Sequence, residues 1–277
     1  MGADLSERVV FMSGGSRGIG LAIAKRLGRD GARVALLAKT GEPHPKLPGT
    51  IYEAASEIEA EGGEALPIVG DVRDAEQVAA AVSQTVDRWG GVDIVVNNAS
   101  AINLSPMRDL EVKRFDLMQQ INARGTFVVT KACLPHLRES DHAHVLTLSP
   151  PLSADLKWLV SHSAYTLSKM GMTMLTVGVA QDEKASGIAA NCLWPRTLIA
   201  TAAVQNLLGG DPTMAKARRP EIMGHAAHAI LTRDPADRTG RCFIDDEVLA
   251  EAGITDLSVY SEPGAELQLD LFLDDWG

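Results

Sequence analysis

The chain alternates regularly between short apolar or β-branched runs and longer segments of helical periodicity, and this alternation constrains its fold more than any other feature. The strand-like runs lie at residues 8–13, 33–38, 65–69, 94–97, 144–149, 189–194 and 241–244. The helical patterns lie around residues 18–29, 50–61, 75–89, 112–136, 163–184 and 220–232. Because a parallel connection needs a crossover of helical length, this order predicts an α/β fold with a seven-stranded parallel sheet flanked by helices on both faces.

The same alternation predicts a single domain over residues 1–277, with a core at about 6–245. No Ser/Gly-rich linker, repeat or charge block interrupts the pattern before about residue 245. Residues 246–277 form a C-terminal extension whose sparse apolar residues predict a segment laid over the body of the domain or over a neighbouring subunit. Its composition indicates no chemical role.

Charge and composition exclude several classes of protein. With 26 Lys+Arg against 36 Asp+Glu, the net charge of -10 has the wrong sign for binding nucleic acid through its phosphates. The longest apolar stretch, residues 170–180, is too short to cross a bilayer, so we expect no membrane span. No secretory signal and no CxxC pattern are visible, which favours a cytoplasmic protein without disulfides. Gly2 and Ser6 fit the loose myristoylation pattern, which chance matches also satisfy.

Three histidines lie close together in the sequence, and histidine is the commonest metal ligand. The spacing of His136, His142 and His144 matches no zinc-binding pattern, however. We therefore predict a polar loop at these residues and no metal site.

A glycine-rich turn, SGGSRGIG at residues 13–20, follows the first predicted strand and opens the first predicted helix. In this context Gly14 permits the tight turn, Gly18 lets the backbone approach a pyrophosphate, and Gly20 allows the helix to pack closely on the strand. The helix N-terminus adds unpaired N–H groups and the positive end of the helix dipole. The pattern predicts a Rossmann-type dinucleotide site, in which the cofactor contacts Gly14, Ser16, Arg17, Gly18, Ile19 and Gly20.

The choice between the two nicotinamide dinucleotides depends on the end of the second predicted strand. NAD enzymes usually carry an acid there to bind the ribose 2′-hydroxyl, whereas this chain has Ala-Lys-Thr at residues 38–40. Lys39 would attract the 2′-phosphate of NADP(H), and Arg17 places a second cation nearby. We therefore expect NADP(H) rather than NAD(H), the alternative being that both cations are simply solvated. The proline- and glycine-rich stretch at residues 41–50 predicts a loop beside the adenosine ribose.

Tyr165 and Lys169 lie four residues apart in a helical pattern, so they share one helix face. A phenol with a pKa near ~10 is a poor acid–base group at neutral pH, but a fixed ammonium beside it stabilises the phenolate and lowers that pKa. The pair predicts proton transfer at a carbonyl or alcohol oxygen, worth roughly 10² to 10⁴ in rate. Taken alone, this spacing is common on helix faces and also fits simple packing and solvation.

Together these motifs make the chain resemble the short-chain dehydrogenase/reductase family over nearly all of residues 6–245. The matching marks are GGSRGIG at 14–20, Asp71 with Val72, NNAS at 97–100, Asn122, and Tyr165 with Lys169. Residues 38–63, LSPPL at 148–152 and NCLWPRTLIATAA at 191–203 are similar to the hydroxysteroid dehydrogenase-like protein 2 subfamily. We do not expect the sterol-carrier domain of that subfamily in this chain.

The resemblance implies roles for the matched residues. Tyr165 would be the proton donor and acceptor, Lys169 would hold the ribose hydroxyls and lower the pKa of the tyrosine, and Asn122 would support a water-mediated proton relay. The implied cofactor contacts are Asp71 at the adenine with Val72 beside it, Asn98 and Ala99 on the adenosine side, and Pro195, Thr197, Leu198 and Ile199 at the nicotinamide end.

The chain departs from the family after the fifth predicted strand, where a serine usually hydrogen-bonds the substrate oxygen. This region reads Leu-Ser-Pro-Pro-Leu-Ser at residues 148–153, and Pro150 occupies the usual serine position. Ser149 comes one place early, while Ser153 has the more familiar distance to Tyr165. We favour Ser149, because it lies at a strand end where α/β sites form, and keep Ser153 as the rival.

A second departure is Arg196, which stands where the family usually has a glycine; we expect it to point to solvent or to meet an acidic substrate. The following segment, residues 197–219, is the family's lid, and its apolar side chains suit a small lipophilic carbonyl or alcohol. The sequence thus predicts an NADP(H)-dependent oxidoreductase acting on a lipid-, terpenoid- or steroid-like substrate. The alternative is a catalytically weak NADP(H)-binding sensor or scaffold module.

Self-association is the last expectation. The family pairs the helix around Asn122 and the tyrosine helix with symmetry mates, and MGMTMLTVGVA at residues 170–180 offers small, flexible apolar side chains for such contact. We expect a homo-oligomer, a dimer or a tetramer. The alternative is that these residues form the monomer core, since one face of that helix must cover the sheet.

Overall fold

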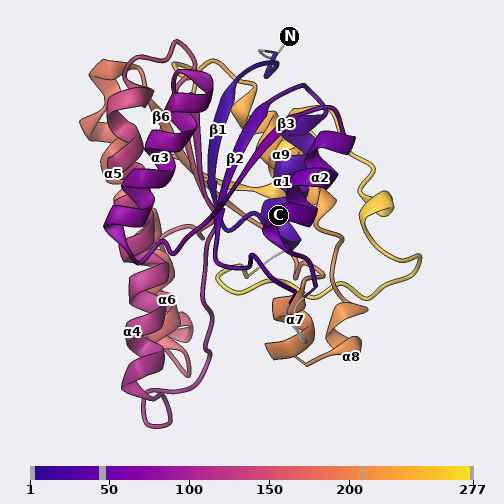
Figure 1. Cartoon of the computed structure of the whole chain (residues 1–277). Helices are drawn as coiled ribbons and strands as arrows, with labels where there is room; N and C mark the ends of the chain where they lie inside the picture. The colour runs from indigo at the N-terminus through magenta and orange to yellow at the C-terminus, as the bar shows by residue number, and fades with distance from the viewer. Residues whose placement is uncertain (1–3, 44–47, 208, 275–277) are drawn as a thin grey trace.

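The computed structural model describes residues 4–43, 48–207 and 209–274, and their strands form one seven-stranded sheet of order β3-β2-β1-β4-β5-β6-β7 (Figure 1). All six pairs of neighbouring strands are parallel. The strands are β1 (Val9–Ser13), β2 (Arg33–Ala38), β3 (Glu64–Val69), β4 (Ile94–Asn97), β5 (His144–Thr147), β6 (Ala189–Trp194) and β7 (Cys242–Ile244). The predicted α/β fold is confirmed.

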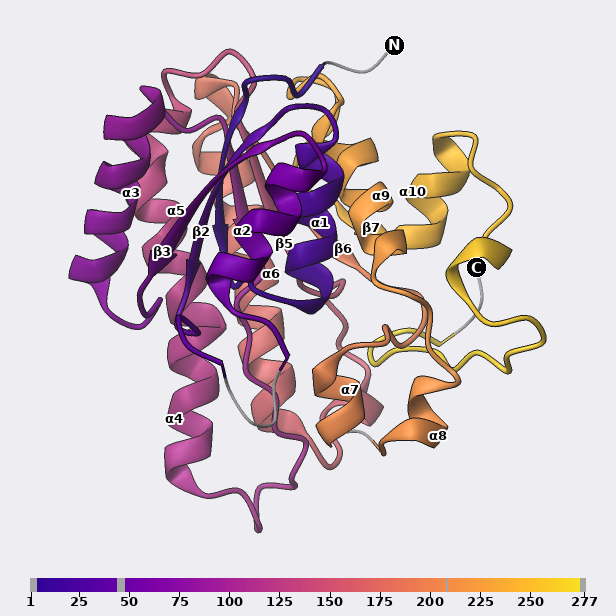
Figure 2. The same ribbon diagram turned by 45° about the vertical axis from the view of Figure 1, so that its right-hand side comes forward.

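Helices cover both faces of this sheet. The α-helices are α1 (Gly18–Gly28), α2 (Ile51–Ala60), α3 (Ala75–Trp89), α4 (Val112–Ile121), α5 (Ala123–Leu137), α6 (Ser163–Asp182), α7 (Ala202–Leu207), α8 (Asp211–Met214), α9 (Glu221–Leu231) and α10 (Asp245–Glu251). The helices α1, α2, α9 and α10 share one apolar core with the sheet, and α3, α5 and α6 share the other. Figure 2 shows α3 and α5 on the opposite side of the sheet from α1 and α9.

Strand β1 shows why the central strands are continuous apolar runs. Val10 and Met12 point into one core and Phe11 into the other, and all three side chains are fully buried. A parallel strand covered on both faces has no polar side, so the period-two alternation of a half-exposed strand disappears.

Two details differ from the sequence-based expectations. The pattern at 112–136 is not one helix, because Asn122 (ψ -77°) separates α4 from α5 while its side-chain oxygen accepts a hydrogen bond from the Ala101 N–H.

The polar loop predicted for the histidines is wrong. His142 and His144 are buried, and their Nε2 atoms lie 2.7 and 3.2 Å from the backbone oxygens of Leu231 and Arg233. Burial lowers the pKa of His144 to about 3.

The C-terminal extension packs on the body of its own domain. Its last described stretch runs antiparallel to the segment after β6, with a bridge between Leu269 and Thr197 and a hydrogen bond of 3.0 Å from the Asp270 N–H to the Arg196 carbonyl oxygen. Phe272 joins an apolar cluster with Met118, Tyr165 and Trp194. The described part of the extension therefore reaches the carboxyl edge of the sheet.

Two sequence-based expectations fall wholly or partly on residues that the structure does not describe. Gly2 of the myristoylation pattern lies outside the described residues, as do residues 44–47 of the predicted loop at 41–50. Among the described residues, no helix combines the length and the apolar composition needed to span a membrane, and no group of three or more His, Cys, Asp or Glu residues is arranged to hold a metal ion.

The close contact between α1 and α9 generates a prediction about stability. A Cβ atom on Gly224 would lie 2.6 Å from the backbone oxygen of Ala22, so Gly224→Ala must push the two helices apart. We expect it to lower the free energy of unfolding by about 1–3 kcal/mol in urea titrations. Gly178→Ala in α6 is the matched control, because a Cβ there meets no described atom within 4 Å, and it should raise stability by about 0.5–1 kcal/mol. Equal stability of the two variants would contradict this account.

Candidate active site

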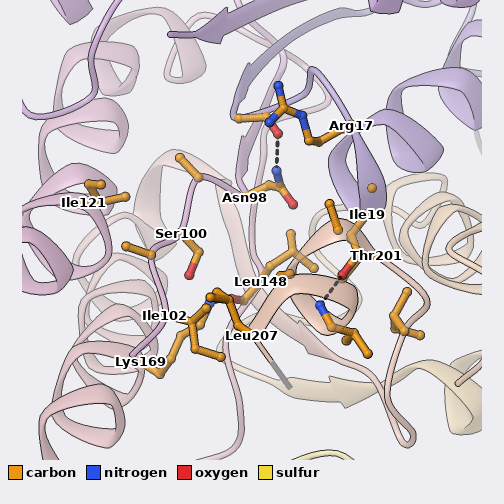
Figure 3. Close-up of a pocket in the computed structure, with 18 of the residues that line it drawn as sticks. Arg17, Ile19, Asn98, Ser100, Ile102, Ile121, Leu148, Lys169, Thr201 and Leu207 are labelled. Atoms are coloured by element: carbon orange, nitrogen blue, oxygen red, sulfur yellow. Dashed lines mark hydrogen bonds between the residues drawn. The ribbon is translucent and has the colours of Figure 1, made fainter. Parts of the chain in front are cut away.

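One cavity of about 740 Å³ lies at the carboxyl edge of the sheet (Figure 3). Arg17 and Asn98 lie toward one end of the view, and Lys169 lies at the other. The predicted site residues that line it are Gly14, Ser16, Arg17, Gly18, Ile19, Lys39, Asp71, Val72, Asn98, Ala99, Tyr165, Lys169, Pro195, Leu198 and Ile199. The predicted residues that do not line it are Gly20, Asn122, Ser149, Ser153 and Thr197.

The glycine turn has the geometry that its sequence predicts. Gly14 and Gly18 have positive φ angles of 76° and 56°, which side-chain-bearing residues rarely adopt. At Gly20, a Cβ atom would lie 2.4 Å from the side-chain nitrogen Nδ2 of Asn98 and 2.7 Å from the Gly14 carbonyl oxygen. That nitrogen donates a hydrogen bond of 2.6 Å to the same carbonyl. The turn is therefore an open cradle of backbone at the start of α1, which fits a pyrophosphate.

Four charged side chains lie around the end of β2. Arg17 donates from Nη2 to the Gly49 carbonyl oxygen at 3.0 Å, while its buried Nε meets no hydrogen-bond partner among the described residues. Lys39 lies 3.2 Å from a carboxylate oxygen of Asp71, which also binds Arg73 through two side-chain nitrogens. Arg73, and to a smaller extent Lys39, hold the pKa of Asp71 well below its usual range.

The side-chain amide of Asn122 forms hydrogen bonds that connect two segments of the chain. Its nitrogen donates to the Ala101 carbonyl oxygen and to the Ser168 hydroxyl, both at 2.9 Å, and its oxygen accepts from the Ala101 N–H at 2.7 Å. The residue is fully buried. It connects the loop after β4 to α6, the helix that carries Tyr165, and the proton relay remains a prediction.

Tyr165 and Lys169 both line the cavity, at exposures of 5% and 3%. Lys169 Nζ donates to the Leu148 carbonyl oxygen at 2.8 Å and lies 5.2 Å from the centre of the Trp194 ring. Burial lowers the pKa of Lys169 to about 8 and, with a smaller contribution from Asp270, raises the pKa of Tyr165. This shift of the Tyr165 pKa is opposite in direction to the lowering predicted from the helix spacing, because burial of the phenol disfavours the phenolate.

The serines considered for the substrate oxygen lie outside the cavity. Ser149 is completely buried near the thiol of Cys192, and its hydroxyl has no hydrogen-bond partner among the described residues. The Ser153 hydroxyl accepts from the Asp155 N–H at 3.2 Å in the loop before α6. The expected role of either serine finds no support in this geometry, because neither hydroxyl reaches the space beside Tyr165.

Arg196 also differs from its expectation. It neither points to solvent nor faces the cavity, being 3% exposed and bound through its guanidinium to Asp246 at 3.1 Å and to Glu247 at 2.5 Å. Its backbone N–H donates to Asp245 Oδ1 at 2.8 Å. The first turn of α10 therefore fixes the segment from Pro195 to Ile199 that was predicted to meet the nicotinamide.

Sequence reasoning missed the part of the cavity wall that the C-terminal extension supplies. Gln268, Leu269, Asp270 and Leu271 line the cavity, and the Leu271 carbonyl oxygen accepts a hydrogen bond of 2.8 Å from Trp194 Nε1. No motif marks these residues. The one available signal is Asp270, an acidic residue between the apolar Leu269 and Leu271. Such a pattern could have indicated a carboxyl that becomes buried.

Comparison with known proteins agrees with this arrangement. The family model of short-chain dehydrogenases matches residues 8–209, which include the glycine turn, Tyr165 and Lys169. The chain belongs to the short-chain dehydrogenase/reductase family. This is a family of oxidoreductases. Membership agrees with the presence of the glycine turn and the tyrosine–lysine pair in one cavity.

Curated relatives cover almost the whole chain. Hydroxysteroid dehydrogenase-like protein 2 of Xenopus laevis is 52% identical over 272 residues, which are 98% of this chain and 64% of that protein. The human protein of the same name is 48% identical over 273 residues, 98% of this chain and 65% of its own length. The chain thus spans slightly less than two thirds of these relatives.

Solved structures show the same fold. A protein from Xanthomonas campestris is 55% identical, with a TM-score of 0.95 over 98% of this chain and 99% of its own. A short-chain dehydrogenase from Mycobacterium thermoresistibile is 56% identical, with a TM-score of 0.92 over 98% and 96% of the two chains. A blue fluorescent protein from a metagenomic library, solved with NADPH, is 27% identical, with a TM-score of 0.74 over 87% and 97%.

The burial of Tyr165 predicts an unusual tyrosine titration. The chain has three tyrosines, and burial raises the pKa of two of them, Tyr165 and Tyr260, so ultraviolet titration should show phenols that resist ionisation. Tyr165→Phe should remove one part of this resistant component, and Tyr260→Phe the other. Phe272 stacks on Tyr165 with ring centres 6.2 Å apart, so Phe272→Ala should admit water and lower the pKa of Tyr165 toward ~10. An unchanged titration of Phe272→Ala would show that this ring does not control the burial.

Proposed function

We propose that this protein is an NADP(H)-dependent oxidoreductase that interconverts a secondary alcohol and a carbonyl in a lipophilic substrate. The observation that carries the proposal is that one cavity is lined both by the glycine turn and by Tyr165 and Lys169. Lys169 lies away from Arg17 in Figure 3. A bound nicotinamide would donate or accept the hydride. The protein would bind, orient and protonate the substrate.

Tyr165 is the proton donor in this proposal. Tyr165 lines the cavity, and its hydroxyl carries a proton at neutral pH that it can pass to a carbonyl oxygen placed beside it. Lys169 supports this transfer from one turn along α6. The hydrogen bond from Lys169 to the Leu148 carbonyl oxygen fixes the side chain at the sheet edge, where it can reach the ribose hydroxyls of a dinucleotide.

The preference for NADP(H) is supported by the charges around the end of β2. Arg17 has a buried nitrogen that lacks a described partner, and Lys39, with 61% of its side chain exposed, can turn from Asp71 toward an anion. A 2′-phosphate would satisfy both groups. No acidic residue occupies the end of β2, where a ribose hydroxyl would be bound in an NAD enzyme.

A lipophilic substrate is supported by the apolar wall near Tyr165. This wall is built by Ile102, Leu104, Trp194, Leu207 and Leu271. We also propose that the protein forms a homo-oligomer, which is supported by the exposed apolar side chains of Phe127, Leu167 and Met174 on α5 and α6. Light scattering tests this assembly, and a strictly monomeric mass would contradict it.

The second candidate is an NADP(H)-binding sensor or scaffold with little turnover. It is favoured by the placement of Ser149 and Ser153 away from the cavity. Tight NADPH binding, no turnover across a broad carbonyl panel, and a partner whose affinity follows NADPH would support it over the enzyme.

The proposed chemistry predicts a specific loss in Tyr165→Phe. With NADPH and the best substrate from a panel of aliphatic, terpenoid and steroid carbonyls, the variant should lose roughly 10²-fold or more in kcat, because the proton donor is gone. NADPH binding should remain within a few-fold, since the phenyl ring still fills its place. Absorbance at 340 nm measures the first quantity and fluorescence titration the second. Full turnover in the variant would refute the mechanism.

The proposed cofactor preference predicts selective effects at Arg17 and Lys39. Arg17→Ala and Lys39→Ala should each weaken NADPH binding by roughly 10- to 100-fold, because each removes a charge-assisted hydrogen bond to the 2′-phosphate. NADH binding should change little. Arg88→Ala, which removes an exposed cation on α3, is the matched control. Equal losses for NADPH and NADH, or a wild-type protein that prefers NADH, would contradict the assignment.

A further inference from the structure

The site described so far lacks one group that carbonyl reduction needs. Besides the proton donor, a second hydrogen-bond donor normally holds the substrate oxygen in place during the transfer. The end of β5 provides none, because the Ser149 hydroxyl is buried, Pro150 has no N–H, and Ser153 lies outside the cavity. Another element must supply this group if the cavity reduces carbonyls efficiently.

The C-terminal extension brings a carboxyl to this place. The Leu198 N–H donates to the Gln268 carbonyl oxygen at 2.9 Å and the Asp270 N–H donates to the Arg196 carbonyl oxygen at 3.0 Å, so the extension is paired with the segment after β6. Two residues later, Phe272 stacks on Tyr165. Asp270 is held between these two anchors and lines the cavity together with Tyr165 and Lys169.

The surroundings of Asp270 favour a carboxyl that is protonated near neutral pH. Burial raises its pKa to about 7, against the opposing effects of the Leu271 N–H, which donates to Oδ1 at 2.7 Å, and of Lys169. Its negative charge acts on both Tyr165 and Lys169, yet no ion pair joins it to a described residue. The carboxyl and the ammonium therefore act on each other across the cavity wall without forming a direct ion pair.

The other charged groups around Asp270 do not neutralise it. Asp245, at the start of α10, has the same sign and adds to the rise in its pKa. The guanidinium of Arg196 is turned to Asp246 and Glu247 on the far side of the segment. On α6, the groups that face Asp270 are Tyr165 and Lys169, the two residues of the proposed chemistry.

We infer that the Asp270 carboxyl is the second oxygen-binding group of this site, donating its O–H to the substrate carbonyl oxygen beside the Tyr165 hydroxyl. The inference rests on the proposed function and adds a residue to it. During reduction the carbonyl carbon receives the hydride and the oxygen takes the proton of Tyr165, while Asp270 keeps its own proton. A buried, protonated carboxyl acting as a hydrogen-bond donor is chemically sound where desolvation disfavours the anion.

This role sets a pH dependence for carbonyl reduction. Below about pH 7 the carboxyl holds its proton and can donate, and as pH rises through that value the donor is lost and a negative charge faces the oxygen. Reduction should therefore fall above neutral pH in the wild-type protein. Asp270→Asn has a permanent N–H donor and no charge, so it should keep the hydrogen bond and lose the fall in rate near pH 7. A change set by Lys169, whose pKa burial lowers to about 8, would remain.

The test compares Asp270→Asn, Asp270→Ala and the control Asp274→Asn in the full chain. Asp274 belongs to the same extension but pairs with Lys157 at the surface. We measure kcat and KM for the best carbonyl of the panel between pH 5.5 and 8.5, together with NADPH affinity by fluorescence. We expect Asp270→Ala to lose roughly 10²-fold in kcat/KM, mostly in kcat. Asp270→Asn should retain activity within a few-fold at pH 6 with a flattened profile, and Asp274→Asn should match the wild type.

The outcomes separate this inference from the function beneath it. If NADPH binds and carbonyls are reduced but Asp270→Ala keeps its kcat/KM, the role of Asp270 is overturned while the proposed function stands. If Asp270→Asn is as poor as Asp270→Ala at pH 6, the donor role is overturned in favour of a carboxylate. Ser100→Ala is included because Ser100 also lines the cavity, and a loss there in place of Asp270→Ala would move the role to that hydroxyl. A wild-type protein that binds no NADPH overturns both proposals.

Discussion

All seven strands of the sheet run in the same direction, so their carboxyl ends meet at one edge, and the cavity depends on that constraint. The Gly14 turn leaves β1 there, the Asn98 loop leaves β4, and the Leu148 carbonyl follows β5 with one lone pair directed at Lys169. At two of these strand ends a backbone carbonyl oxygen accepts a hydrogen bond from a side chain, Gly14 from Asn98 and Leu148 from Lys169. These contacts hold the two side chains at the cavity.

Desolvation governs the chemistry of the deeper end of this cavity. It raises the pKa of the Asp270 carboxyl to about 7 and lowers that of the Lys169 ammonium to about 8, so both groups change protonation close to neutral pH. The same burial keeps the Tyr165 hydroxyl protonated. Titratable groups displaced in this way are typical of active sites, and here they belong to α6 and to the C-terminal extension.

Three segments that are distant in the sequence form one wall of the site. The backbone from Pro195 to Ile199 is held from behind by Asp245 and Asp246 at the start of α10, and from its other side by the extension that carries Asp270. Arg196, which departs from the usual sequence pattern of the family, holds this segment to α10 through ion pairs with Asp246 and Glu247. The departure from the pattern is therefore structural, and it places no arginine side chain in the cavity beside Tyr165.

Local patterns in the sequence predicted a large part of this protein. The bounds of β2, β4 and β6 and of α3 agree with the strand and helix patterns to the residue, because burial on both faces or on one stripe imposes a period that neighbours along the chain reveal. The positive φ angles of Gly14 and Gly18 and the shared face of Tyr165 and Lys169 are also local properties, and the sequence was sufficient for them.

Other properties depend on contacts between residues far apart in the chain. Whether Ser149 faces the cavity is decided by the packing of β5 against β6, which leaves its hydroxyl near Cys192. The ion pairs of Arg196 span about fifty residues, and the pairing of Asp270 with the segment after β6 spans more than seventy. The shifted pKa values follow from burial, which a sequence does not contain. The sequence by itself determined the elements and the motifs, and the tertiary structure decided which polar groups face the substrate.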